Sequence, residues 1–377
     1  MKKLLIITRW YLPAVKSGGT VRSISALAKG LNSDFDLTIL TSDRDLGAKE
    51  PYKNVKFDEL TFYENIPIIY LSKLKLAPIY KHIKEISPDI IYINSFFDIT
   101  TQIIMFLKLQ GKIKSKIILA PRGELADGAL SIKAKKKSIY IRLYKLFNLS
   151  KNIIFHATSK DDLSDIKNKF PDNEVVLIPN PKEEDKTEYS LPYKEKNKVR
   201  IVFISRIAPV KNLLFALNIL DSRDIKEDII FDIYGPDEDI EYWNICKEKI
   251  NRLPKNIEVN YRGFVNPSDI GITLSKYHLF FLPTKGENFG HAIIEAMQVG
   301  LIPLISDKTP WQDLENLKVG FILSLDNQNK FLKAIKEIVS IDNSQFIDYS
   351  KNIKEYISKK LDNRKTIEEY KKVFLVD

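Results

Sequence analysis

Hydrophobic positions along the chain follow two alternating patterns. Short, nearly continuous apolar runs predict buried strands, and segments with an apolar residue every three or four positions predict helices. The first unit combines a strand over Lys3–Thr8, a helix over Val21–Leu31 and a strand over Leu37–Thr41. Strands that alternate with helices from the first residue favour βαβ units and parallel sheets.

The alternation forms two blocks separated by a polar stretch. The first block continues with strands over 89–94, 117–120 and 153–158. The stretch from Pro181 to Lys198 contains prolines and has no apolar period, so we expect a linker there. The second block comprises a strand over 200–204, a helix over 212–220, and strands over 229–234, 257–261, 279–283 and 302–305. The pattern therefore predicts an α/β protein with two doubly wound domains, whose ligands bind beyond the carboxyl ends of the strands.

Composition adds limited information. The 377 residues exceed the usual size of a single core, in agreement with two domains. The single cysteine, Cys246, excludes an intramolecular disulfide and fits a reducing cytoplasm. The apolar run over Leu4–Ile7 is too short for a secretory segment, so we expect a soluble or peripheral protein. The net charge of +10 suggests an acidic partner but does not choose among nucleic acid, membrane and phosphorylated substrate.

The segment from Lys285 to Met297 carries the strongest chemical signal. It follows an apolar strand and places Glu287 before a predicted helix and Glu295 within it. Amides at a helix start favour a bound phosphate, and here they would belong to Asn288, Phe289 and Gly290. Carboxylates can accept hydrogen bonds from sugar hydroxyls, so the segment predicts a ligand site with both functions.

Four segments together resemble the retaining glycosyltransferases of family 4. They are Gly286-Glu287-Asn288-Phe289-Gly290 with Glu295-Ala296-Met297, Ser205-Arg206-Ile207 with Lys211-Asn212, Leu177-Ile178-Pro179-Asn180-Pro181, and Ser17-Gly18-Gly19-Thr20-Val21-Arg22. The resemblance spans nearly the whole chain. It implies a GT-B fold, in which two Rossmann-like domains face a central cleft and a C-terminal helix crosses back to the N-terminal domain. The implied boundaries are an acceptor-binding domain over 1–180, a linker over 181–198, a sugar-nucleotide domain over 199–360 and the final helix over 361–377.

The resemblance also implies roles for individual residues. Arg206 and Lys211 would hold the donor diphosphate, Glu287 the sugar and Glu295 the ribose. The other expected donor-binding residues are Gly18, Gly19, Phe264, Asn288, Phe289 and Gly290. A strand end and a helix start can bring the two cations to one point, where they would stabilise the charge of the leaving phosphate. In a retaining transfer the phosphate itself takes the acceptor proton, so no side-chain base is required.

The sequence departs from the family pattern at Arg122. Many members have a histidine before Gly-Glu, whereas this chain has Arg122-Gly123-Glu124, as in members that resemble surface-polysaccharide transferases. We therefore expect Arg122 and Glu124 at the acceptor side of the cleft and no catalytic histidine at this position. His156 lies in an apolar strand and fits a core residue, and His291 is the histidine expected to face the cleft.

The expected function is a metal-independent hexosyltransferase that moves a sugar from a nucleoside diphosphate sugar, in the first place a UDP-sugar, to a glycan or lipid-linked glycan precursor of a surface polysaccharide. It needs no cofactor besides the donor substrate. A non-catalytic sugar-nucleotide-binding protein and a phosphorylase or epimerase relative remain alternatives. A dinucleotide oxidoreductase is disfavoured because no G-x-G-x-x-G follows a strand. A metal site at Asp43 and Asp45 is disfavoured because the residues that resemble the GT-B pattern account for binding of the phosphates. A nucleic acid partner is disfavoured because Glu287 and Glu295 would repel its phosphates.

One further segment is basic and amphipathic. Between Ala129 and Lys160 there is no Asp or Glu. The cations before Lys160 are Lys133, Lys135, Lys136, Lys137, Arg142, Lys145 and Lys151, with apolar residues interleaved. Two interpretations stay open: a helix that rests on an anionic membrane, or an ordinary helix whose apolar side is core. The expected location is the cytoplasm, with the inner face of the cell membrane as the setting of the first interpretation.

Overall fold

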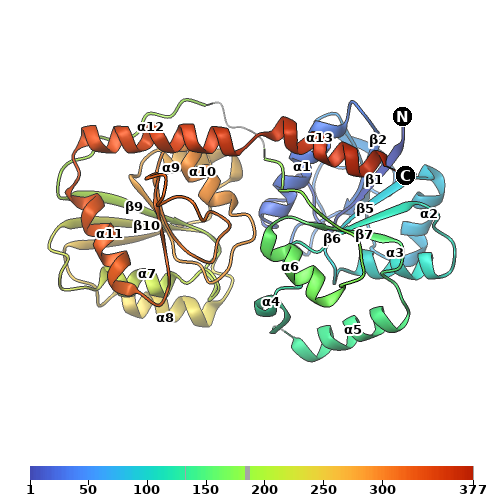
Figure 1. Ribbon diagram of the computed structural model, residues 1–377, viewed down its shortest axis with the longest axis horizontal. Helices are drawn as coiled ribbons and strands as arrows, with labels where there is room; N and C mark the ends of the chain where they lie inside the picture. The colour runs from blue at the N-terminus through green and yellow to red at the C-terminus, as the bar shows by residue number, and fades with distance from the viewer. Residues whose placement is uncertain (132, 183–186, 377) are drawn as a thin grey trace. The chain divides into compact units, whose positions relative to one another are not determined.

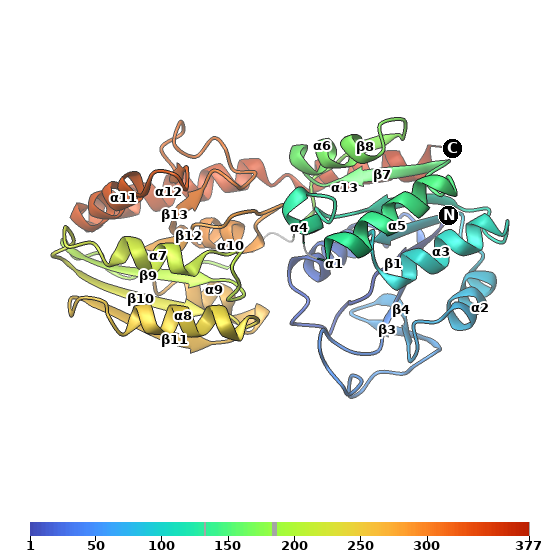
Figure 2. The same cartoon turned by 90° about the horizontal axis from the view of Figure 1, so that it is seen from below.

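The computed structural model describes residues 1–131, 133–182 and 187–376 (Figures 1 and 2). These residues form two compact units, one of 1–182 with 363–376 and one of 187–362. Part of the expected linker, 183–186, and the last residue of the expected final helix, 377, lie outside the described residues. Each unit is an α/β structure with its own central sheet.

The first unit has an eight-stranded sheet of order β3-β4-β2-β1-β5-β6-β7-β8 among the described residues. Its strands are β1 (Lys3–Ile7), β2 (Asp36–Ser42), β3 (Leu60–Tyr63), β4 (Ile66–Leu71), β5 (Ile90–Asn94), β6 (Lys116–Ala120), β7 (Ile153–Ala157) and β8 (Val175–Leu177). All neighbours are parallel except β3 and β4, which form an antiparallel hairpin. The expectation of a wholly parallel sheet is therefore wrong at this edge. Glu64 and Asn65 both adopt positive φ, as the tight turn between β3 and β4 requires.

Alternate residues of the inner strands pack into two separate cores in the first unit. The helices are α1 (Gly19–Leu31), α2 (Leu76–Ile86), α3 (Ile99–Leu109), α4 (Asp127–Ser131), α5 (Ala134–Leu146), α6 (Lys160–Lys169) and α13 (Asn363–Leu375). Leu4 and Ile6 of β1 pack with residues of α1 and α13. Leu5 and Ile7 pack with residues of α2, α3, α5 and α6. Because successive side chains of the strand point to opposite faces, both faces of the sheet are covered by helices.

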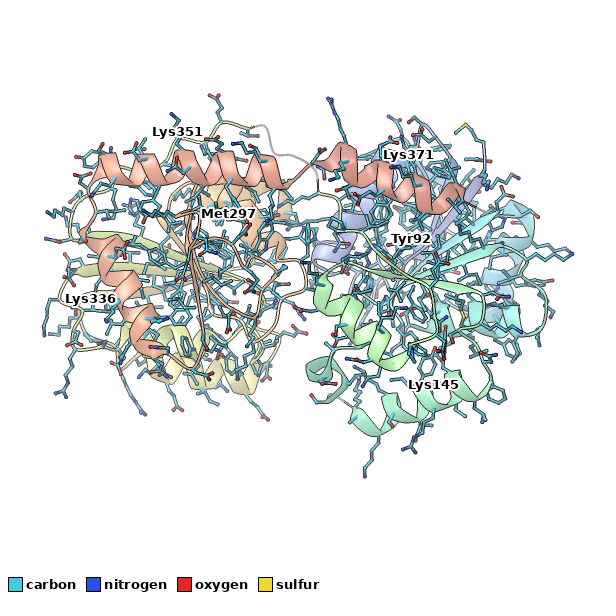
Figure 3. The ribbon with its side chains drawn as sticks, viewed as in Figure 1. Tyr92, Lys145, Met297, Lys336, Lys351 and Lys371 are labelled. Carbon is cyan, nitrogen blue, oxygen red and sulfur yellow. The ribbon has the colours of Figure 1, made fainter. Side chains whose placement is uncertain are left out.

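The C-terminal helix α13 belongs to the first unit although it is the last element of the chain. Tyr370 and Phe374 are each 1% exposed and lie in the same core as Tyr92 of β5. Lys371, labelled in Figure 3, pairs with Asp34 at 3.0 Å. Burial of each aromatic ring stabilises the unit by roughly 2–3 kcal/mol, from which the entropy cost of ordering the side chain is subtracted. The structure therefore shows the return of the chain to its N-terminal unit.

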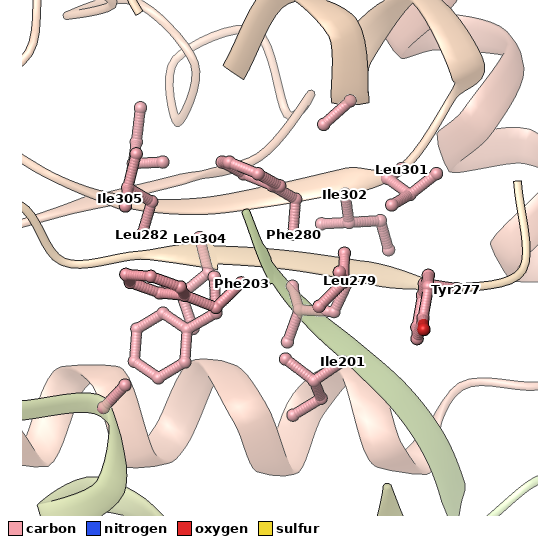
Figure 4. Packing of buried hydrophobic residues seen from close by; sticks show 14 of the residues in the cluster. Ile201, Phe203, Tyr277, Leu279, Phe280, Leu282, Leu301, Ile302, Leu304 and Ile305 are labelled. Carbon is pink, nitrogen blue, oxygen red and sulfur yellow. The ribbon is translucent and has the colours of Figure 1, made fainter. Parts of the chain in front are cut away.

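The second unit has a six-stranded parallel sheet of order β11-β10-β9-β12-β13-β14 in the described chain. Its strands are β9 (Lys198–Ile204), β10 (Asp228–Tyr234), β11 (Ile257–Gly263), β12 (Leu279–Leu282), β13 (Ile302–Ser306) and β14 (Phe321–Leu323). Figure 4 shows how the strand residues interdigitate, among them Phe203 of β9, Phe280 of β12 and Leu304 of β13. Continuous apolar strands of this kind fit a sheet covered on both faces.

Helices cover both faces of the second sheet. They are α7 (Leu213–Leu220), α8 (Ile240–Ile250), the 3₁₀ turn η1 (Pro267–Asp269), α9 (Ile270–Leu274), α10 (His291–Val299), α11 (Gln328–Ser340) and α12 (Asn343–Lys360). Helix α7 contacts α8 and α11, and α10 contacts α9 and α12. The two groups lie on opposite sides of the sheet (Figure 1). This arrangement is a doubly wound fold.

The described end of the linker is attached to the second unit by a buried lysine. Lys194 is 1% exposed, and its Nζ donates to the carbonyl oxygens of Glu195, Val339 and Ile341 at 2.9, 3.1 and 3.1 Å. Burial lowers the pKa of Lys194 to about 8. Three carbonyl acceptors compensate part of the cost of placing the ammonium group there. This part of the expected linker is therefore packed structure.

Candidate functional site

The main candidate site lies where the connections of the second sheet change direction. From β9 the chain proceeds to β10 on one side, and β12 is the neighbour of β9 on the other side. In doubly wound sheets, ligands bind in the crevice outside the carboxyl ends of the strands at such a point. The loop after β9 carries Arg206 and Lys211, and the loop after β12 carries Glu287.

Hydrogen bonds to one carbonyl fasten these two loops together. The oxygen of Val210 accepts from the amide of Lys285 at 2.7 Å and lies 3.0 Å from Oγ1 of Thr284. Thr284 is fully buried, and its Oγ1 also accepts from the amide of Gly286 at 3.2 Å. The loop after β13 adds a third support, because Glu287 N donates to the carbonyl oxygen of Lys308 at 2.9 Å. The backbone on both sides of the crevice is thus held in one geometry.

This fastening brings a cation and a carboxylate into direct contact. Lys211 Nζ donates to Glu287 Oε2 at 2.6 Å, and the two side chains are 12% and 21% exposed. The residues are 76 positions apart in the sequence. A charge-assisted hydrogen bond in such a shielded place is stronger than a surface ion pair. The two residues that the sequence assigns to diphosphate and sugar therefore lie side by side.

Arg206 has a different partner. Its NH1 atom donates to Glu238 Oε2 at 2.6 Å, and both side chains are 46% exposed. Sequence reasoning did not identify Glu238, which precedes α8 and shares no motif with Arg206. An exposed ion pair contributes about 0–1 kcal/mol and can readily be exchanged for a phosphate contact. The convergence of Arg206 with Lys211 on one diphosphate stays a prediction.

The helix after Glu287 begins later than the sequence suggests. Helix α10 starts at His291, so Asn288 and Phe289 lie in the preceding loop, and the first helical amide is that of His291. Gly290 causes the delay because it adopts φ 79°, outside the helical region. A Cβ at Gly290 would lie 3.2 Å from Cγ of Glu287. The amides at the helix start therefore belong to His291 and the residues after it, and phosphate binding there stays a prediction.

The next residues of interest lie along one face of α10. His291 and Glu295 are both partly exposed and stand four positions apart, on the side away from the buried residues of the helix. Phe289 packs edge-on against His291 at 4.8 Å between ring centroids, and its carbonyl oxygen accepts from Trp311 Nε1 at 3.0 Å. Phe264 follows the edge strand β11 and is 47% exposed. The roles of Glu295 in ribose binding and of Phe264 in donor binding stay predictions.

The first unit has a polar cavity at its own change of direction, between β1 and β5. The cavity measures about 320 Å³. Its lining includes Thr8, Arg9, Trp10, Ser17, Thr20, Asn94, Asp98, Arg122 and Glu124. Arg9 NH1 contacts Asp98 Oδ2 at 3.1 Å, and its guanidinium carbon lies 5.0 Å from the centroid of the Trp10 ring. Arg9, Trp10 and Asp98 were not identified from the sequence, since no motif includes them.

The structure places Arg122 and Glu124 at this cavity, where both make hydrogen bonds within the unit. Arg122 donates to Asn94 Oδ1 at 2.7 Å and to Asn180 Oδ1 at 2.6 Å. Glu124 accepts from the Ser95 hydroxyl at 2.7 Å and from the amides of the next two residues at 2.6 and 3.1 Å. Burial raises the pKa of Glu124. Contact of Arg122 and Glu124 with an acceptor stays a prediction.

Asp45 organises the glycine loop of the first unit. Gly18 precedes α1 with φ 72°, and Gly19 is the first residue of that helix. Asp45 Oδ2 accepts from the amides of Val15 and Lys16 at 2.8 and 3.0 Å, and Oδ1 accepts from the Ser17 hydroxyl at 3.0 Å. These bonds hold the backbone that leads into Gly18. The sequence had weighed Asp45 only as a metal ligand.

Asp43 pairs with the residue that follows it in the sequence. Both of its oxygens accept from Arg44, at 2.7 and 3.0 Å. In the described residues no group of three or more His, Cys, Asp or Glu side chains is arranged to hold a metal ion. Asp43 therefore pairs within the chain.

His156 is a core residue with both ring nitrogens engaged. It is 1% exposed, and Nδ1 lies 2.8 Å from the Tyr92 hydroxyl while Nε2 lies 2.8 Å from the carbonyl oxygen of Ile178. Burial lowers its pKa to about 3. The interpretation of His156 as a satisfied core residue is confirmed.

Comparison with known proteins gives relatives along the whole chain. Residues 183–360 match the family model described as Glycosyl transferases group 1. The chain is 23% identical to an uncharacterized glycosyltransferase of Methanocaldococcus jannaschii over 99% of this chain and 98% of that protein. It is also 23% identical to an uncharacterized 41.2 kDa protein in the cps region of Klebsiella pneumoniae over 70% of this chain and 73% of that protein.

Solved structures with the same architecture have lower identity. A sucrose-phosphate synthase from Thermosynechococcus elongatus superposes with TM-score 0.75 at 15% identity, over 99% and 98% of the two chains. WaaG, a glycosyltransferase involved in lipopolysaccharide biosynthesis, gives 0.70 at 11% over 99% and 100%. Anabaena HepE in complex with UDP and glucose gives 0.71 at 14% over 99% of each chain. The chain thus has the GT-B fold, and residues 183–360 are similar to the group 1 glycosyl transferase model.

Proposed function

We propose that the protein is a retaining glycosyltransferase that transfers a sugar from a nucleoside diphosphate sugar, in the first place a UDP-sugar, to a glycan or lipid-linked glycan precursor of a surface polysaccharide. The observation that carries the proposal is the contact between Lys211 and Glu287 at the crevice beside β9 and β12. The cation suits a phosphate and the carboxylate suits sugar hydroxyls. Because the two side chains are 2.6 Å apart, they suit a ligand in which a phosphate is adjacent to a sugar.

The chemistry assigned to the site follows from the charge that develops during transfer. When the bond between the sugar and the diphosphate breaks, negative charge grows on the leaving phosphate. Lys211 is held at the crevice, and Arg206 lies on the same loop with an exchangeable partner. Cations held in place stabilise that charge without reorganisation. The amides at the start of α10 would add a favourable dipole.

Glu295 is proposed for the ribose, Phe264 and the glycine loop at Gly18 and Gly19 for the donor, and the cavity of the first unit for the acceptor. UDP as the donor nucleotide is supported by the complex of HepE with UDP and glucose. A surface-polysaccharide acceptor is supported by the location of one relative in a cps region and by the role of WaaG in lipopolysaccharide biosynthesis. We propose metal-independent transfer in the cytoplasm.

A two-stage experiment tests the proposal. A thermal-shift screen with UDP, GDP, ADP and other nucleoside diphosphates identifies the donor base, because a ligand of the folded state raises its stability. Incubation of the matching nucleotide sugars with glycan acceptors then reveals transfer, and NMR of the product reports whether the anomeric configuration is retained. Donor incubated alone distinguishes an epimerase, and donor with inorganic phosphate a phosphorylase.

Variants connect the activity to the site. Replacing Arg206 and Lys211 by alanine should together lower turnover by roughly two to four powers of ten, since they act on charge that develops in the transition state. The matched control is Lys276→Ala, an exposed lysine near the opposite end of β12. Wild-type turnover in both Arg206→Ala and Lys211→Ala would refute the diphosphate assignment.

A further inference from the structure

Helix α5 has two apolar sides, of which only one is used inside the first unit. Tyr140 and Tyr144 point inwards and pack against Phe96 at 5.5 and 4.9 Å between ring centroids. Phe97 and Phe170 complete this aromatic cluster. Tyr144 is fully buried. These rings attach the helix to the body of the unit and account for its inner face.

The outer side of α5 carries a second apolar row. Ile139, Leu143, Leu146 and Phe147 are 57%, 46%, 76% and 54% exposed. Their spacing of four, three and one residues places them on one face, with Phe147 just after the end of the helix. Single exposed apolar residues are common, but a row of four on one helical face is characteristic of an interaction surface.

Cations lie beside and within this outer row, and acidic residues are absent from the whole segment. Lys135, Lys136 and Arg142 are exposed. When the helix is traced at 100° per residue, Lys135 and Arg142 fall on one side of the row and Lys136 falls between Leu143 and Phe147. No Asp or Glu occurs from 129 to 160. Lys145, on the lower edge of the unit in Figure 3, lies over the Phe170 ring at 5.6 Å. The outward face therefore combines an apolar row with exposed cations and has no carboxylate.

We propose that this outer face of α5 docks on the surface of an anionic lipid bilayer. The apolar row would enter the boundary between headgroups and acyl chains, and the exposed cations would contact lipid phosphates. Four apolar side chains in a row disfavour a nucleic acid as the partner, because base and phosphate contacts would leave them in water. A segment with many cations and no carboxylate also disfavours a second copy of the same face, since like charges would meet. No helix in the described residues is long and apolar enough to cross a membrane.

Vesicle flotation with the full chain tests the proposal. We expect binding to vesicles of phosphatidylglycerol and phosphatidylcholine at low salt, weak binding at high salt, and none to phosphatidylcholine alone. The triple variant K135E/K136E/R142E should lower the partition coefficient at least about a hundredfold, because each basic residue near the surface contributes about fivefold. Replacing Ile139, Leu143 and Leu146 by serine should lower it about tenfold or more. All six side chains are exposed, so thermal unfolding should be little changed.

A matched control separates the α5 surface from net charge. The triple variant K330E/K333E/K336E changes three exposed lysines of α11, including Lys336 in Figure 3, and produces the same change in charge. The partition coefficient of this α11 variant on anionic vesicles should lie within about twofold of the wild-type value. As a second readout, Leu143→Trp should be quenched by brominated lipids only in anionic vesicles.

Four results would overturn the proposal: no binding at low salt, equal loss in the α5 and α11 charge variants, unchanged binding of the serine variant, or no quenching of the tryptophan. A lipid-free dimer that disappears in the serine variant would also overturn it, since the row would then be an interface between copies. The proposal stands independently of the transferase activity, because none of its variants touches Lys211 or Glu287.

Discussion

The contact between Lys211 and Glu287 leads to a prediction that runs against simple loss of function. Glu287→Gln keeps the shape of the side chain and removes its negative charge. A diphosphate held by Lys211 would lie near this carboxylate, which is in contact with Lys211 Nζ at 2.6 Å. Repulsion between the carboxylate and the phosphates opposes binding of the free nucleotide. We therefore predict that Glu287→Gln binds UDP more tightly than the wild-type protein and transfers sugar more slowly.

The magnitude follows from the charges and their shielding. Two unit charges about 6 Å apart interact by about 3 kcal/mol at an effective dielectric constant of about 20. Partial exposure of the pair, at 12% and 21%, and physiological salt reduce the net effect to about 1 kcal/mol, or about fivefold in Kd. Lys211 would lose its counter-ion, so the free energy of unfolding should fall by about 1–2 kcal/mol. Loss of a sugar contact in the transition state should lower turnover by about a hundredfold.

Calorimetry with UDP, combined with turnover measurements, distinguishes the roles. Lys211→Met should weaken UDP binding, and Glu295→Gln should weaken it through the ribose. Glu238→Gln is the matched control, because it removes the partner of Arg206 from a pair in which both side chains are 46% exposed. Its stability should change by less than about 0.5 kcal/mol. UDP affinity that falls in Glu287→Gln as much as in Lys211→Met would refute the reasoning.

Three other predictions address the backbone, metals and pH. Gly290→Ala should lower the free energy of unfolding by about 1–3 kcal/mol, because φ is 79° and a Cβ would approach a side-chain carbon to 2.8 Å; an unchanged Tm would contradict this. Transfer should persist in excess EDTA, and Asp45→Asn should raise the donor KM by loosening the glycine loop; chelator inhibition reversed by manganese would instead favour a metal at Asp43 and Asp45. Burial lowers the pKa of His156 to about 3 and of His278 to about 4, below the usual 6.5, so their stability contribution is complete above pH 6.5 and lost as pH falls towards these values. In urea unfolding, the free energy of unfolding should fall by up to about 1.4 kcal/mol for each histidine as the pH is lowered by one unit. The fall should be smaller in His278→Gln.

The sheets could be predicted from the sequence because their strands are buried on both faces. Strands such as β1 and β12 read as continuous apolar runs, and the structure has both within a residue or two of the predicted bounds. Both strands of the β3–β4 hairpin were missed, β4 although Ile66–Leu71 is a buried apolar run and β3 because it lies at the sheet edge. Leu60 and Phe62 are 55% and 66% exposed, so β3 lacks a buried run. Strand pairing at an edge depends on a turn and on tertiary contacts more than on hydrophobicity.

The site could be predicted only where its residues follow strand ends. Lys211 and Glu287 follow neighbouring strands, so their proximity depends on the order of strands, which sequence alone does not establish. Glu238 lies 32 positions from Arg206 on another loop, and no local pattern reveals such a pair. The delayed start of α10 has a local cause in Gly290, which is the N-cap of the helix with φ 79°. Tertiary hydrogen bonds, which have no period in the sequence, determined these outcomes.

The fastening of the two loops has a consequence for how a ligand would bind. Val210, Thr284 and Lys285 fix the backbone on both sides of the crevice, and Glu287 holds the ammonium group of Lys211 close to it. A diphosphate would therefore meet a lysine that is already ordered. Its binding would weaken the existing ion pair but would cost little side-chain entropy. The displaced carboxylate would be left beside the sugar, where hydroxyl donors can replace the lost partner. A nucleotide without a sugar leaves that carboxylate uncompensated, so the same pair that orders Lys211 should favour the intact donor over the free nucleoside diphosphate.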